Sequence, residues 1–198
     1  MNVGIYIYDQ AEVLDFSGPF EVFSVASRFL EENEKFNVFL VNEINKSVQA
    51  RGGYSINPNY SFSNHPKIDI LIVVGGIHTE EVKKENVINW IKNISKKTKI
   101  NASVCTGAFL LAQAKVITNH TVTTHWEDVD DLKKNYPSLN IKRDVRWVDE
   151  GSIITSAGIS AGIDMSLHLV SKIINEELAI KTAKQMDFDW KRNFKCNT

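Results

Sequence analysis

Short apolar runs alternate with segments of helical spacing along most of this chain, and this alternation limits the possible folds more than any other feature. The run VGIYIY (3–8) precedes a helix-like segment that is expected to start near Ser17 and Pro19, and FNVFLVNE (36–43) forms a second run. The run DILIVVGG (69–76) is apolar and ends in two glycines, which is typical of a central strand buried on both faces. The alternation predicts an α/β sandwich with a mainly parallel central sheet.

The same pattern continues to the C-terminal part of the chain. A strand at about 100–104 leads into a helix from Thr106. We expect a short hairpin or an extended segment in 47–62 and a second hairpin in 144–156, with its turn at Asp149–Gly151. A further strand is expected near 120–124, and further helices are expected in 79–98, 126–136, 160–176 and 177–186. The chain has 198 residues, 43% of them hydrophobic, which suits one globular domain. We assign this domain to residues 1–190 and a surface tail to residues 191–198.

Charge and cysteine content exclude several classes of protein. Lys and Arg number 23 against 24 Asp and Glu, so no basic excess indicates nucleic-acid binding. No apolar run reaches the roughly 18 residues that a membrane span needs, and the N-terminus lacks the features of a signal peptide. Cys105 and Cys196 are the only cysteines, too few for a disulfide framework. We therefore expect a cytoplasmic protein that binds neither nucleic acid nor membranes.

Cys105 lies in ASVCTGAFLLAQA, between an expected strand and an expected helix. Ser103 and Gly107 flank it at both second-neighbour positions, and a sharp strand–nucleophile–helix turn needs such small neighbours. The N-terminus of the following helix would favour a thiolate and lower the thiol pKa below its free value of about 8.5. The alternative is that Cys105 is a small buried apolar residue. The position at the turn favours a reactive nucleophile.

The segment Gly75-Gly76-Ile77 follows a buried strand and forms a second candidate site. A glycine pair lets backbone N–H groups approach a ligand. Together with the N–H of Thr106, Gly76 could form an oxyanion-type pocket for negative charge on a substrate atom. The alternative is a plain tight turn.

Asp15 lies between Leu14 and Phe16, just before an expected helix. One interpretation is a helix cap, although Ser17 could equally fill that place. The other is a proton carrier, because partial burial near a thiolate would raise the carboxyl pKa and let it give and take a proton. Sequence spacing alone leaves both open.

Five motifs in order give the chain a family resemblance: LDFSGPFEVF, VVGG, SVCTGAFLLAQA, TTHW and TSAGISAGIDMSLHLV. Together they resemble the ThiJ/PfpI superfamily of the class I glutamine-amidotransferase-like fold, and most of all its isonitrile hydratases and the N-terminal domains of some AraC-type regulators. The resemblance implies a flavodoxin-like three-layer sandwich, a homodimer and a nucleophile at Cys105. It makes Asp15 the acidic partner and gives Thr106 and Gly76 backbone N–H groups that face the substrate.

Two histidines are possible further site residues. His125 in TTHW follows an expected strand, and relatives with glyoxalase-like activity use a histidine at about this position. In the isonitrile hydratase branch the same motif occurs without an evident cysteine–histidine pair. His78 follows the glycine pair and is a candidate for the pocket mouth. No histidine shows metal-ligand spacing, so we expect no metal and no cofactor.

The resemblance implies an enzyme that hydrates a small isonitrile to an N-substituted formamide through Cys105. Two alternatives remain open. One is glyoxalase III or deglycase chemistry on methylglyoxal, with His125 recruited. The other is a non-catalytic domain that senses small molecules or oxidants. The AraC-type regulators add a helix-turn-helix of roughly another hundred residues, and because this sequence stops at Thr198 we do not expect it to be a whole regulator of that kind.

Overall fold

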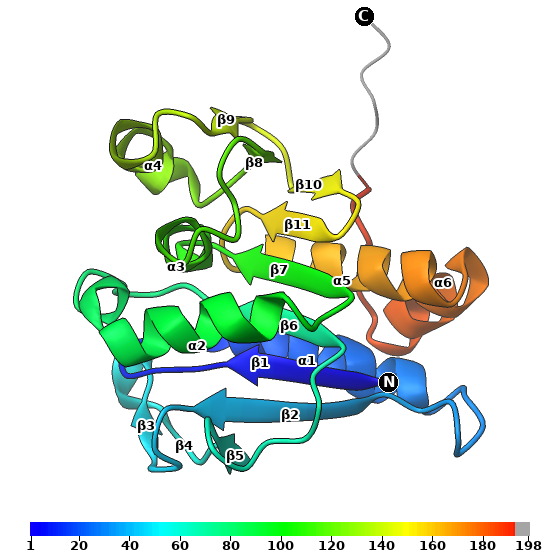
Figure 1. Ribbon diagram of the computed structural model, residues 1–198. Helices are drawn as coiled ribbons and strands as arrows, with labels where there is room; N and C mark the ends of the chain where they lie inside the picture. The colour runs from blue at the N-terminus through cyan, green and yellow to red at the C-terminus, as the bar shows by residue number, and fades with distance from the viewer. Residues whose placement is uncertain (193–198) are drawn as a thin grey trace, which may run out of the picture.

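The computed structural model describes residues 1–192, which form a seven-stranded sheet in the order β10-β11-β7-β6-β1-β2-β5 (Figure 1). Every neighbouring pair is parallel except the hairpin of β10 and β11, so the prediction of a mainly parallel sheet is confirmed. The strands are β1 (Asn2–Tyr6), β2 (Asn37–Asn42), β5 (Tyr60–Ser61), β6 (Ile70–Val73), β7 (Ile100–Val104), β10 (Trp147–Glu150) and β11 (Ile153–Ser156).

Helices cover both faces of the sheet and complete the predicted three layers. In Figure 1, α2 and α3 lie in front of the sheet, and α1, α5 and α6 pack on one another behind it. The helices are α1 (Val13–Ser27), α2 (Glu85–Ser95), α3 (Gly107–Gln113), α4 (Val129–Asn135), α5 (Ala161–Ile173) and α6 (Glu176–Gln185).

Two small pairs of strands lie outside the main sheet. The expected hairpin in 47–62 forms from β3 (Val48–Gln49) and β4 (Ser55–Ile56) around a 3-10 turn, Arg51–Gly53. The strand expected near 120–124 is β8 (Thr121–Val122), which pairs with β9 (Asn140–Ile141) instead of joining the main sheet.

Helix α1 starts at Val13, several residues before the expected start near Ser17 and Pro19. Proline lacks the N–H that bonds the carbonyl four residues earlier, so a helix start close to Pro19 was the expected outcome. Bonds to distant segments hold the earlier start in place: the N–H of Glu12 donates to the Gly75 carbonyl at 3.0 Å, and the Asp15 carboxyl accepts two backbone N–H groups from other segments. As a result Asp15 lies in the first turn of α1 and not before it.

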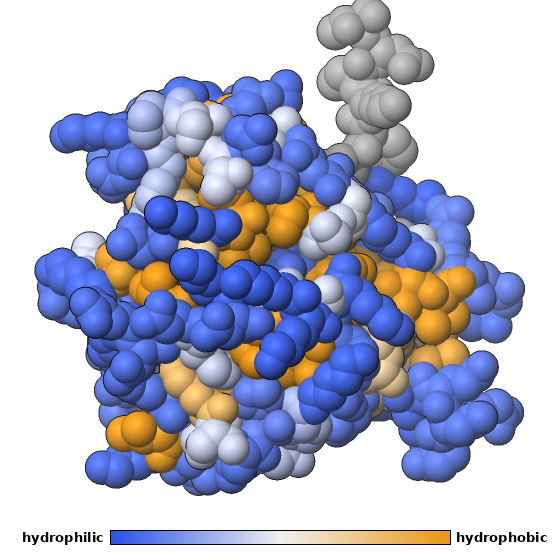
Figure 2. Space-filling model, in the orientation of Figure 1, coloured by the Kyte–Doolittle hydropathy of each residue, from blue (hydrophilic) through white to orange (hydrophobic). Residues whose placement is uncertain are grey.

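The core is centred on the middle strands, and polar residues dominate the outer surface. All four residues of β6 are fully buried, as expected for a strand covered on both faces. Figure 2 shows a largely hydrophilic face with apolar side chains in several places, one of them where α6 lies, and Ile174 and Ile180 are exposed apolar residues at the end of α5 and on α6. None of the helices within residues 1–192 is both long and apolar enough to cross a membrane.

The segment after α6 lies against α5. Trp190 donates its indole N–H to the Asp164 carbonyl at 3.2 Å, and the backbone N–H of Lys191 donates to Asp164 Oδ1 at 2.8 Å. Arg146 forms an ion pair with the same buried carboxylate. Of the expected tail 191–198, the part from residue 193 lies outside the described residues, and so does Cys196.

The turn from β7 into α3 brings the start of the helix directly against β6. A Cβ on Gly107 would lie 2.1 Å from the carbonyl oxygen of Val73, far inside any real contact distance. Gly107, which the sequence singled out as a small neighbour of Cys105, is therefore a steric requirement of this turn.

Gly107→Ala should lower the free energy of unfolding by about 3 kcal/mol, because a rigid backbone carbonyl must move to admit the methyl group. Urea unfolding followed by circular dichroism measures this. Gly151→Ala is the matched control, since Gly151 has a positive φ of 82° but nothing within 4 Å of the added Cβ. The control should lose only about 1–2 kcal/mol from backbone strain. Equal losses in the two variants would contradict the steric explanation.

Candidate active site

Cys105 sits at a strained turn between β7 and α3, as the sequence predicted. Its φ is +55°, a conformation that residues other than glycine seldom adopt. The backbone N–H of Cys105 donates to the carbonyls of Ser156 and Ala157 at 3.2 and 3.3 Å, and the Thr124 hydroxyl donates to the Cys105 carbonyl at 2.8 Å. These bonds from the segments after β8 and at the end of β11 hold the turn at Cys105 in place.

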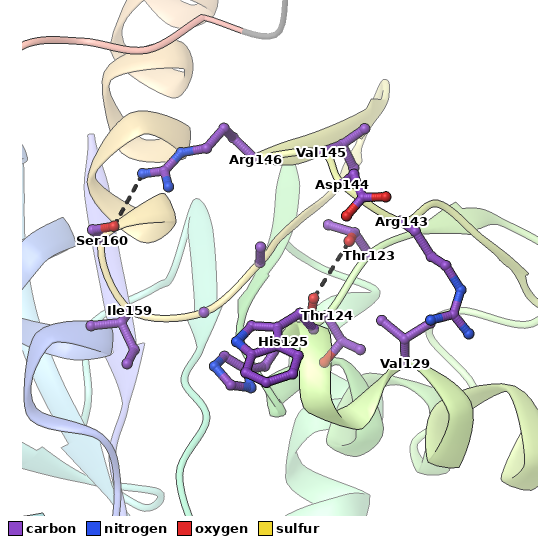
Figure 3. Close-up of a pocket in the computed structure, with 13 residues that line it drawn as sticks. Thr123, Thr124, His125, Val129, Arg143, Asp144, Val145, Arg146, Ile159 and Ser160 are labelled. Atoms are coloured by element: carbon purple, nitrogen blue, oxygen red, sulfur yellow. Dashed lines mark hydrogen bonds between the residues drawn. The ribbon is translucent and has the colours of Figure 1, made fainter.

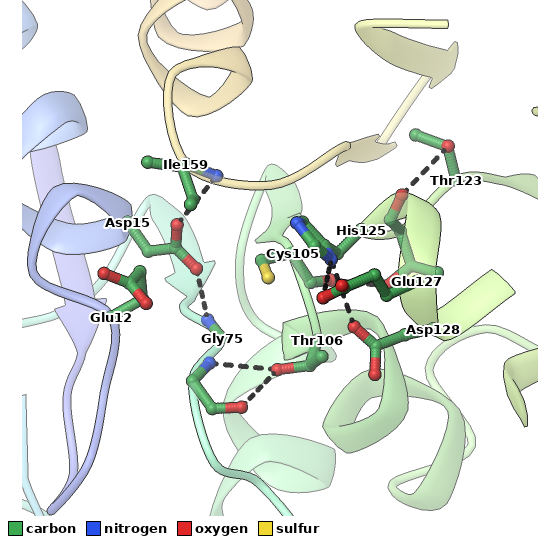
Figure 4. Close-up of polar contacts among 12 residues, drawn as sticks. Glu12, Asp15, Gly75, Cys105, Thr106, Thr123, His125, Glu127, Asp128 and Ile159 are labelled. Carbon is green, nitrogen blue, oxygen red and sulfur yellow. Dashed lines mark hydrogen bonds and ion pairs between the residues drawn. The ribbon is translucent and has the colours of Figure 1, made fainter. Parts of the chain in front are cut away.

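Asp15 is fully buried and contacts three parts of the chain at once. Its Oδ2 accepts the backbone N–H of Gly75 at 3.0 Å, and its Oδ1 accepts the backbone N–H of Ile159 at 3.1 Å. The Cys105 thiol lies close enough to the Asp15 carboxyl for each group to shift the pKa of the other. Figure 4 shows the Cys105 sulfur between the Asp15 carboxyl and the His125 ring. Asp15 is thus in reach of the thiol, and no side chain caps α1.

Burial dominates the electrostatics of the Asp15–Cys105 pair. It raises the pKa of Asp15 to about 7, although the hydrogen bonds from Gly75 and Ile159 act in the opposite direction. Burial also raises the pKa of the Cys105 thiol, and the negative charge of Asp15 raises it further. The backbone N–H of Thr106 lowers the thiol pKa, but by less. The expected depression of the thiol pKa is therefore wrong, because loss of solvation outweighs the helix N-terminus.

The glycine pair does not offer the free N–H groups that the sequence suggested. The N–H of Gly76 donates to Thr106 Oγ1 at 2.9 Å, and the same hydroxyl donates to the Gly76 carbonyl at 2.9 Å. The N–H of Gly75 is held by Asp15. An oxyanion pocket built from the amides of Gly76 and Thr106 is therefore not formed here. Ile77 is 49% exposed and does not line the cavity described next.

Cys105 opens into a cavity of about 620 Å³. Sequence reasoning missed several residues of its wall, among them Arg51 and Ile159, because their approach to Cys105 depends on contacts between distant segments. Arg51, on the turn between β3 and β4, lies 3.5 Å from Glu12 in an ion pair, and its N–H donates to the Ala11 carbonyl at 3.0 Å. The cavity is lined by Glu12, Arg51, Gly52, Gly76, Cys105, Thr106, His125, Glu127, Asp128 and Ile159.

The two candidate histidines differ in position. His125 lines the Cys105 cavity, and its Nδ1 lies 3.4 Å from Asp128 Oδ2 and 3.7 Å from Glu127 Oε2. His78 packs on the ring of Phe109 with centroids 4.3 Å apart, does not line the cavity, and has its pKa lowered by burial. No group of three or more His, Cys, Asp or Glu side chains in residues 1–192 is placed to hold a metal ion.

Comparison with known proteins agrees with the geometry. The sequence model described as the DJ-1/PfpI family matches residues 1–172, which include all the candidate site residues. Isonitrile hydratase of Pseudomonas putida is 26% identical over 189 residues, covering 95% of this chain and 78% of that protein. The HTH-type transcriptional regulator CdhR of Pseudomonas aeruginosa is 28% identical over 173 residues, covering 87% of this chain. The chain spans only about half (51%) of the regulator's length.

The fold is also similar to that of solved structures. A crystal structure of a ThiJ/PfpI family protein from Pseudomonas syringae superposes with a TM-score of 0.85 at 21% identity, covering 100% of this chain and 78% of that chain. The resemblance drawn from the five sequence motifs is therefore confirmed for the family and for the fold.

The raised pKa of Asp15 makes a specific prediction for stability. The folded state holds the Asp15 proton more tightly than the unfolded chain does. The contribution of this proton to the free energy of unfolding is therefore complete below the ordinary pKa of 3.8 and is lost as the pH rises through about 7. The melting temperature of the wild type minus that of Asp15→Asn should therefore fall between pH 5 and pH 8. Glu21→Gln, an exposed change on the same helix, is the control and should give a constant difference. A wild-type advantage that grows with pH would contradict the assignment.

Proposed function

This chain belongs to the DJ-1/PfpI family, and on that premise we propose that it is a cofactor-independent enzyme resembling isonitrile hydratase. In this proposal Cys105 adds to a small electrophilic carbon and water releases the product. The single observation that carries the proposal is that the buried Asp15 carboxyl lies beside the thiol of Cys105, which lines a cavity (Figure 4). This pairs a nucleophile with a group that can carry its proton.

The Asp15–Cys105 pair supplies the nucleophile and the proton that addition to the isonitrile needs. With one proton shared between carboxyl and thiol, the sulfur adds to the terminal carbon of the isonitrile while the proton passes to the same carbon. The product is a neutral thioimidate on Cys105, and Asp15 is left as a carboxylate. Thr106, whose backbone N–H lowers the thiol pKa, lines the cavity next to Cys105 and can donate this N–H to the reacting group.

The same carboxylate then serves the second step. Asp15 takes a proton from water as the water oxygen adds to the thioimidate carbon, and this proton goes to the nitrogen. Cleavage of the carbon–sulfur bond releases the N-substituted formamide, and the remaining hydroxyl proton returns to the Asp15–Cys105 pair. One isonitrile and one water give one formamide, and the enzyme ends in its starting state.

Two observations favour other functions of the same site. His125 lines the same cavity as Cys105 and lies near the Asp128 carboxylate, which favours glyoxalase III or deglycase chemistry on methylglyoxal. The similarity to a transcriptional regulator favours a domain that senses small molecules or oxidants. The variants below separate these functions.

Substitution of the pair should show that the two residues act together. Cys105→Ala should abolish formation of formamide from an isonitrile, and Asp15→Asn should lower the turnover about a hundredfold or more. The double variant should be no worse than Cys105→Ala, since the two groups form one unit. Product formation is followed by chromatography, with Glu21→Gln as the control that keeps full activity.

His125→Ala separates the enzymatic alternatives. It should cost much less on an isonitrile than Asp15→Asn does. A large loss from His125→Ala on methylglyoxal, with a mild loss from Asp15→Asn, would reverse the assignment in favour of glyoxalase-type chemistry. Saturable ligand binding without turnover in any variant would favour the sensing function.

The pH profile gives an independent check. The reactive form has lost one of the two protons of the pair, and the pKa of about 7 for Asp15 places this loss near neutrality. The value of kcat/KM should therefore rise about tenfold per pH unit below 7 and level off above it. Asp15→Asn should remove this step. A profile that falls above pH 7 would mean that the fully protonated pair reacts.

We further propose a homodimer in the cytoplasm. The homodimer rests on the family resemblance, and the compartment rests on the low cysteine content. Static light scattering should give about twice the chain mass of 22.4 kDa at micromolar concentration. A monomer mass under the same conditions would count against the dimer.

A further inference from the structure

A second cavity of about 650 Å³ adjoins the Cys105 cavity. His125 and Ile159 line both cavities, so these two side chains form the wall between them. Figure 3 shows the second cavity between the segments that contain Thr123 and Thr124, Arg143 to Arg146, and Ile159 and Ser160. The two cavities are therefore neighbouring compartments on the same edge of the sheet.

The two compartments differ in chemistry. The Cys105 cavity is lined by charged side chains, among them Glu12, Arg51 and Asp128. The second cavity has the apolar side chains of Trp126, Val129 and Val145 in its wall. Its wall also carries Asp144 and two arginines, and the arginines form ion pairs with acids outside the lining, Arg143 with Asp130 and Arg146 with Asp164, which compensates their charge.

Contacts with the candidate active site hold the wall between the cavities in place. Ile159 has a φ of +59°, which is rare for a β-branched residue, and its N–H donates to Asp15 Oδ1. On the other side, a Cβ on Gly158 would lie 2.2 Å from Cδ2 of His125, so the loop packs directly on the histidine ring. The second cavity therefore has a fixed position relative to Cys105.

We propose that the two cavities form one bipartite substrate site. The reactive carbon lies at Cys105, and an uncharged apolar or aromatic substituent of the substrate lies in the second cavity against Trp126. An apolar group placed among the charged side chains of the first cavity would strip water from them, which is unfavourable. The same group in the second cavity buries its surface and contacts an aromatic ring. This deepens the proposed function by naming the substrate class, small electrophiles with an apolar substituent.

Alkylation of Cys105 tests the site without requiring turnover. In a Cys196→Ser background, the rate constants for iodoacetamide and for N-benzyl iodoacetamide are measured by peptide mass mapping. Trp126→Ala should lower the ratio of the benzyl rate to the plain rate about tenfold, because only the benzyl ring reaches the second cavity. Trp126→Phe keeps an aromatic ring and should restore most of the ratio. Trp126 is 73% exposed, so these variants should fold.

Ile180→Ala is the matched control, an exposed apolar residue on α6 outside both cavities, and should leave the ratio unchanged. An unchanged ratio in Trp126→Ala, or an equal loss with both reagents, would overturn the bipartite site. A change of oligomeric mass in Trp126→Ala would also overturn it, by indicating that a second copy covers this cavity. If the ratio falls as expected but no isonitrile is hydrated, the bipartite site stands and the proposed reaction fails.

Discussion

The site depends on one buried carboxyl group that holds three distant segments together. Asp15, in the first turn of α1, accepts backbone N–H groups from the segment after β6 and from the loop between β11 and α5. A buried carboxyl is unfavourable without such partners. The two bonds therefore stabilise the side chain and also place Gly75 and Ile159 around Cys105. The segment after β6 and the wall to the second cavity therefore take their positions beside the thiol from this group.

The sequence predicted the parts of the fold that depend on local pattern. Apolar runs such as 69–76 predicted buried strands, and the small residues around Cys105 predicted a strained turn, because hydrophobic period and steric size are properties of neighbouring residues. The start of α1 was missed, since the bonds of Glu12 and Asp15 to distant segments outweigh the local preference at Pro19. Arg51 was missed because its place in the cavity depends on a bond from its N–H to Ala11, which spacing in the sequence does not reveal.

The candidate site also shows where local reasoning about charge fails. The helix start after Cys105 predicts a low thiol pKa, and the Thr106 N–H does act in that direction. The opposite outcome comes from burial and from Asp15, and neither effect can be judged from the residues next to Cys105. In the same way, two glycines predict available N–H groups, but the Thr106 hydroxyl occupies the one on Gly76. In both cases the residue that changes the outcome is far away in the sequence: Asp15 from Cys105, and Thr106 from Gly76.

Backbone strain at Cys105 and Ile159 has a consequence for ligand binding. Both residues have a positive φ, and both are held by hydrogen bonds that form when the chain folds. The entropy of aligning thiol, carboxyl and cavity wall is therefore lost during folding and not when a ligand arrives. A ligand that enters this rigid site loses mainly its own freedom of motion, so affinity should depend on how well its shape matches a cavity that is already formed.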